Sequence, residues 1–75
     1  MDSSYPRRMH AIRIVDLAQD SQFDEDFLEV PHVGEEIMFV EEDGVFVAPV
    51  LRVVHESSRS MKVTRVYVGA RTREK

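Results

Sequence analysis

A chain of 75 residues is expected to form one domain, and it lies close to the size below which a protein struggles to bury a sufficient core. It contains no Cys, which excludes disulfides and thiolate zinc sites, and its hydrophobic content of 43% argues against wholesale disorder. The sequence has no apolar run long enough for a membrane span and no pattern typical of a secretory signal. We therefore expect a cytoplasmic single domain over residues 1–75, with mobile ends at 1–8 and 70–75.

The net charge of −4 conceals a strong segregation of charge along the chain. Residues 1–15 carry three Arg and one Asp, residues 16–43 carry eleven acidic residues and no Lys or Arg, and residues 44–75 carry seven basic and two acidic residues. Such blocks are typical of a charged binding surface. They are also typical of segments that neutralise each other across strands. The second interpretation is the one we favour.

The first expected strand spans residues 9–17, where Ile12 and Ile14 alternate with Arg13. Residues 18–29 are ambiguous, because Ser21 is a suitable cap for a short helix while the acidic composition suits a loop. We favour a loop with at most one helical turn.

Three apolar residues in this acidic segment are expected to close the open end of a barrel: Phe23, Phe27 and Leu28.

The central stretch, residues 30–56, predicts a turn, a strand, a hairpin and a longer strand. Pro31 and Gly34 indicate the turn. The dipeptide Asp43-Gly44 lies between two apolar runs and predicts a type I′ hairpin that pairs residues 37–42 with 45–50. Pro49 interrupts the returning strand, residues 45–54. It indicates a bulge or bend at a barrel corner, the alternative being an edge position that faces solvent.

A last strand is expected over residues 61–68, after a polar loop at 55–60. Four to five short antiparallel strands with one acidic connection predict a mainly all-β fold, a small SH3-like barrel. An OB-like barrel is the alternative, but the chain is short for it. The residues expected to be largely buried are Ile14, Ile37, Phe39, Val47, Val53 and Val66.

No residue pattern specifies a reaction. The three His residues, at 10, 32 and 55, lack the short spacing of a zinc motif. The acidic run 24–26 lacks the alternating ligands of a calcium loop, and the three Gly are too scattered to cradle a phosphate. We expect a non-enzymatic protein with no catalytic residue, no cofactor and no metal.

A basic face on the last two strands is the candidate binding surface, and it comprises Arg52, Arg59, Lys62, Arg65 and Tyr67. Basic residues beside an exposed aromatic are typical of barrels that bind single-stranded nucleic acid, but the overall acidity works against a phosphate ligand. The leading hypothesis is therefore a protein-interaction or assembly module, a monomer or homodimer, with an unidentified protein partner and no membrane contact. The alternative is nucleic-acid binding through the basic C-terminal hairpin.

Two short motifs resemble those of a group of small, single-domain bacterial proteins of unassigned function. Residues 31–35 are similar to their P-x-V-G-[D/E] turn, and residues 50–55 are similar to their V-x-x-V-x-H strand. In that group the two motifs flank a Gly-containing hairpin, as they do here, although Pro49 is a departure. The resemblance implies an SH3-like barrel, a bacterial source and a stand-alone module, and it carries no activity.

Overall fold

The computed structural model describes residues 9–57 and 63–74. The strands are β1 (His10–Asp16), β2 (Ser21–Phe27), β3 (Glu36–Glu41), β4 (Gly44–His55), β5 (Thr64–Val68) and β6 (Thr72–Arg73). The predicted all-β fold is confirmed, and the described residues contain no helical segment, hence none with the length and apolarity to cross a membrane.

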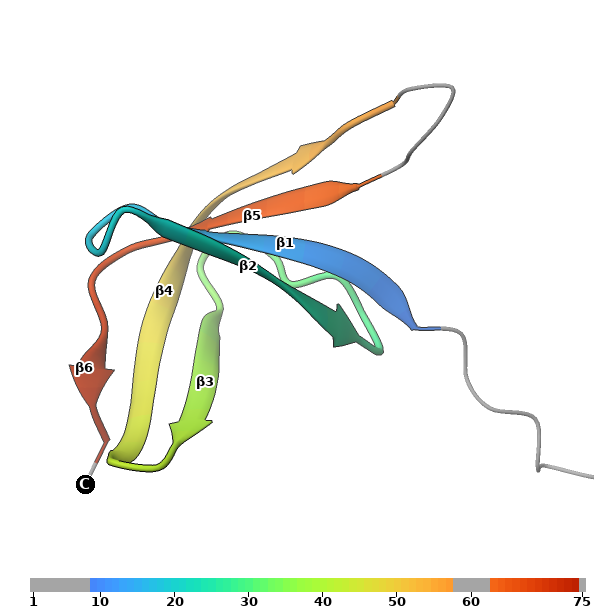
Figure 1. Cartoon of the computed structure of the whole chain (residues 1–75). Helices are drawn as coiled ribbons and strands as arrows, with labels where there is room; N and C mark the ends of the chain where they lie inside the picture. Colours follow the sequence, from blue (N-terminus) through green and yellow to red (C-terminus); the bar gives the residue numbers. More distant parts are fainter. Residues whose placement is uncertain (1–8, 58–62, 75) are drawn as a thin grey trace, which may run out of the picture.

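The strands form one strongly curled sheet with the order β2-β1-β5-β4-β3, and β6 pairs with the beginning of β4. Figure 1 shows the long strand β4 with β3 and β6 along its lower half and with β5, β1 and β2 fanning out beside its upper half, so that the sheet curls into half a barrel. All neighbours are antiparallel except β1 and β5, which run parallel, so the prediction of a wholly antiparallel barrel is wrong in this pair. Parallel neighbours need a long connection, and here β2, β3 and β4 lie between β1 and β5 in the sequence.

Residues 21–27 are a strand, so both the loop and the helix predicted there are wrong. β2 pairs with β1 along its whole length, with Phe23 opposite Ile14 and Asp24 opposite Arg13. Phe23 and Phe27 pack against the core, while the three acidic residues between them are exposed. Acidic residues are poor strand formers, so it is the partner strand that determines this conformation. Leu28, which was expected to help close the barrel, is exposed.

The central hairpin is confirmed, with its turn one residue earlier than predicted. β3 pairs with residues 44–49 of β4, and the two turn residues are Glu42 and Asp43. Gly44 has φ of +146°, whereas Asp43 does not adopt a positive φ, so this is not the type I′ turn centred on Asp43-Gly44. The Arg73 side chain donates a hydrogen bond to the Asp43 carbonyl oxygen at 2.8 Å, which ties β6 to the turn.

The predicted bend near Pro49 is confirmed, because β4 changes partners at that point. Its first half pairs with β3 and its second half with β5, and the register skips one residue between Val50 and Arg52, which is a β-bulge. The turn at residues 31–35 lies against this bend. Gly34 donates its backbone N–H to the Val50 carbonyl oxygen at 3.1 Å, and Val50 donates to the Glu35 carbonyl oxygen at 2.8 Å.

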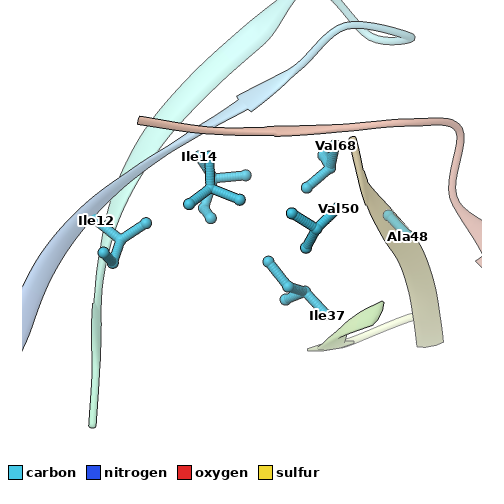
Figure 2. Close-up of a cluster of buried hydrophobic side chains, with 7 residues drawn as sticks. Ile12, Ile14, Ile37, Ala48, Val50 and Val68 are labelled. Carbon is cyan, nitrogen blue, oxygen red and sulfur yellow. The ribbon is translucent and has the colours of Figure 1, made fainter. Parts of the chain in front are cut away.

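The core lies in the concave face of the curled sheet, where buried side chains of β1, β3, β4 and β5 meet (Figure 2). Its members are Ile12, Ile14, Ile37, Ala48, Val50, Val66 and Val68. Three of the six predicted core residues, Ile14, Ile37 and Val66, are buried. The other three, Phe39, Val47 and Val53, are only half-buried. Phe39 lies where the barrel is open beside β3, whereas Val47 faces away from the core, because it alternates with the buried residues Ala48 and Val50.

The C-terminal segment, which was expected to be mobile over residues 70–75, adds the short strand β6 beside β4. Thr72 pairs with Val47 and Arg73 with Phe46, and Glu74 donates its backbone N–H to the Val45 carbonyl oxygen at 2.7 Å. Residues 1–8, also expected to be mobile, lie outside the described residues, as does residue 75.

Candidate functional site

Three of the five residues of the predicted basic face lie in the described part of the chain. Arg52 of β4 is opposite Tyr67 of β5, and its guanidinium carbon lies 5.7 Å from the centre of the Tyr67 ring. Arg65 forms an ion pair with Glu56 at the end of the same hairpin. Arg59 and Lys62 lie outside the described residues.

The acidic and basic blocks of the sequence meet across neighbouring strands. Arg13 of β1 donates from Nε to Asp24 Oδ1 of β2 at 2.9 Å. This hydrogen bond lowers the pKa of Asp24 from its ordinary value and raises the pKa of Arg13. Exposed pairs of this kind contribute little stability, but they lower the net charge of the surface that carries them.

A cleft of about 580 Å³ lies between β2 and β3, the two outer strands of the sheet. Its floor is apolar and includes Phe23, Phe27, Ile37 and Phe39. Its walls carry Glu25, Asp26 and Glu41, with Met38, Val40 and Arg71. The volume is in the range of ligand-binding sites. A second hollow of about 360 Å³ shares Phe27, Ile37 and Met38 with it and extends it toward Pro31 and His32.

One end of this cleft is built by Arg71, a residue of the segment that the sequence predicted to be mobile. Its guanidinium lies over the Phe39 ring, 4.2 Å from the ring centre, and Phe39 in turn contacts the edge of the Phe23 ring. Arg71 Nη1 donates to Glu41 Oε2 at 2.7 Å, and Arg71 Nε donates to Asp16 Oδ2 at 3.2 Å. The Glu41 carboxylate is the largest cause that raises the pKa of Arg71.

Asp16, the second partner of Arg71, has a completely buried side chain. Its second carboxylate oxygen, Oδ1, accepts a hydrogen bond from the Gln19 backbone N–H at 3.1 Å. A buried carboxylate is stable only when it is paired and hydrogen-bonded. Asp16 therefore links the turn after β1 to the C-terminal segment and to the rim of the cleft.

β3 is an unusual outer strand, because it is apolar on both faces. Ile37 and Phe39 point to the core side, whereas Met38 and Val40 are 58% and 76% exposed. On the same outer face of the hairpin, Met38 is opposite Val47 and Val40 is opposite Val45. Outer strands are usually protected by charges or bulges, and an exposed apolar one is a ready site for strand pairing.

His32 borders the hollow that extends the cleft, and the other two histidines lie elsewhere. His10 and His55 line a separate hollow together with Met9, Glu56 and Thr64. His55 Nδ1 lies 3.3 Å from Thr64 Oγ1. Within residues 9–57 and 63–74, no three His, Asp or Glu side chains come together as a metal site would require.

The cleft is the feature that sequence reasoning missed. It was missed because residues 21–27 were not recognised as a strand and Arg71 was assigned to a mobile tail. A signal existed for β2, since Phe23, Glu25 and Phe27 share one parity with acidic or polar residues at the positions between them.

Comparisons of the chain with family models, with curated proteins and with solved structures find no match.

Proposed function

We propose that the chain is a non-enzymatic protein-interaction module and that its binding site is the cleft between β2 and β3. The observation that carries the proposal is a cleft with Phe23, Phe27 and Phe39 at its base, between two strands that have no strand partner on their outer edges among the described residues. An apolar floor gains free energy when a ligand removes it from water, and the free edges supply backbone hydrogen-bond donors and acceptors. A protein segment satisfies both requirements.

The charge distribution supports a protein ligand over a nucleic acid. Several basic side chains of the described residues have partners: Arg13 pairs with Asp24, Arg65 with Glu56, and Arg71 with Asp16 and Glu41. The walls of the cleft are mainly acidic. Phosphate binding depends on basic residues that release counterions, so this surface is poorly suited to it.

The proposal is tested by selecting peptides from a random library against the folded chain. Selected peptides are then titrated into ¹⁵N-labelled protein. We expect enrichment of binders whose chemical-shift changes map to β2 and β3. Met38→Asp should weaken them, while Leu51→Asp, a matched change at an exposed apolar residue on the bulge of β4, should not.

Failure to select any binder, or shift changes confined to the surface around Arg52 and Tyr67, would contradict the proposal. The second of these results would move the binding surface to the predicted basic face, which is also the face that the nucleic-acid alternative uses. Titration of a labelled single-stranded oligonucleotide at low and physiological salt then tests that alternative, because phosphate binding falls steeply with salt.

A further inference from the structure

We infer that the ligand of the cleft is an extended peptide with alternating apolar residues and basic ends, which adds as a strand along the free edge of β3. This inference rests on the proposed function and specifies the partner's chemistry. Strand addition is a known mode of peptide recognition, in which backbone hydrogen bonds give affinity and alternate side chains give specificity.

The faces of β3 determine the alternation of the peptide. A strand beside β3 places every second side chain on the inner face, over Phe23, Phe27 and Phe39 in the cleft. The side chains between them lie on the outer face beside Met38 and Val40, which are exposed. β3 has six residues, so the docked segment is about 20 Å long.

The charges around β3 determine which residue types suit the two ends of the peptide. The apolar run 37–40 has Glu36 at one end and Glu41, Glu42 and Asp43 at the other. Across the cleft, Glu25 and Asp26 of β2 add two more carboxylates. The one basic side chain that lines the cleft among the described residues is Arg71, which is already paired with Glu41 and Asp16. Lys or Arg at both ends of the peptide would complement this acidic rim.

The same charges argue against a second copy of the chain on this edge. Two β3 strands related by twofold symmetry pair antiparallel, with residues of the same face opposite each other. Pairing centred on Met38 places Glu35 opposite Glu41, and pairing centred on Phe39 places Glu36 opposite Glu42. Like charges directly opposite are destabilising in both registers. β2 is a poorer edge still, because it carries three consecutive exposed acidic residues, Asp24, Glu25 and Asp26.

The test uses a fluorescein-labelled decapeptide, Lys-Lys-Val-Thr-Val-Thr-Val-Thr-Lys-Lys, and the full chain at physiological salt. We expect saturable binding, followed by fluorescence anisotropy. Glu36→Lys should weaken it roughly tenfold or more, because it places a like charge beside the basic end of the peptide. Glu74→Lys is the matched control, since it makes the same charge change beside β4 on the edge opposite β3, and it should leave the affinity within about twofold.

Two further peptides test strand addition itself. Amides of alternate residues in a strand point to the same side, so only one set pairs with β3. We therefore expect N-methylation of one set, the three Val or the three Thr, to abolish binding. N-methylation of the other set should leave the affinity unchanged.

The inference is overturned if both methylated peptides bind equally or neither binds. It is also overturned if a decapeptide with the four Lys replaced by Glu binds as well as the original one. If peptides selected from the library occupy the cleft while the decapeptide does not bind, the inference fails and the proposed function stands. If no peptide of either kind binds, both fail.

Discussion

Replacing Asp16 by Ala is expected to lower the free energy of unfolding by about 3 kcal/mol. The carboxylate is 0% exposed and accepts one hydrogen bond on each oxygen, from Gln19 N–H and from Arg71 Nε. Both are hydrogen bonds to a charged group, each worth about 1.5–3 kcal/mol, and the lower end of that range gives about 3 kcal/mol for the two. The loss stays at the lower end of the 3–5 kcal/mol typical of an orphaned buried charge, because Glu41 still neutralises Arg71 from the exposed side.

The assay is urea unfolding followed by far-ultraviolet circular dichroism. For a domain of this size a loss of 3 kcal/mol also lowers Tm by roughly 12–24 °C. The total stability expected for 75 residues is only about 4–11 kcal/mol, so Asp16→Ala is near the limit of folding. Asp16→Asn retains the shape of the side chain and an oxygen acceptor. It should therefore lose less stability than Asp16→Ala, and it provides a second measurement.

The matched control is Asp24→Ala, which removes the carboxylate of the exposed pair with Arg13 and should unfold close to the wild type. If Asp16→Ala unfolded within about 0.5 kcal/mol of the wild type, the size of a typical surface substitution, the reasoning that assigns a structural role to the buried carboxylate would be refuted.

Three other expectations follow from the same structure. Phe39→Ala should cost about 2 kcal/mol in urea unfolding, less than the 3–5 kcal/mol of a fully buried Phe, because the ring is half-buried; a loss above about 4 kcal/mol would contradict an open cleft. Gly44→Val should cost about 1–2 kcal/mol, since φ is +146° and a Cβ there would lie 2.2 Å from Arg73 Nη1; an unchanged Tm would be inconsistent with this backbone. Because the pKa of Asp24 is lowered from 3.8, its ion pair contributes stability above about pH 4 that is lost as the pH falls through the lower folded value. Asp24→Asn should therefore be only slightly less stable than the wild type at pH 7 and should converge with it in acid, and a constant difference down to pH 2 would count against the pairing.

Local patterns were sufficient to predict the central hairpin and the bend of β4. The apolar run 37–40, the glycine at position 44 and Pro49 each act through the backbone of their own neighbourhood, so their consequences can be derived without the rest of the fold. The sequence also predicted an all-β domain and three of the buried residues, Ile14, Ile37 and Val66. The error of one residue in the turn arose because Glu42 and Asp43 have ordinary negative φ, and the preference for Asp-Gly is only statistical.

The tertiary structure alone decided which strands lie at the edges and what lies between them. β2 is a strand because β1 pairs with it, although its own residues are poor strand formers. Asp16 and Arg71 are 55 positions apart, and their contact depends on the parallel pairing of β5 with β1, which no local signal indicates. The cleft between β2 and β3 has the same origin, since it exists only where the curled sheet fails to close. Contacts of this kind are determined by how the whole chain buries its apolar surface, and a pattern read over a few residues contains no information about them.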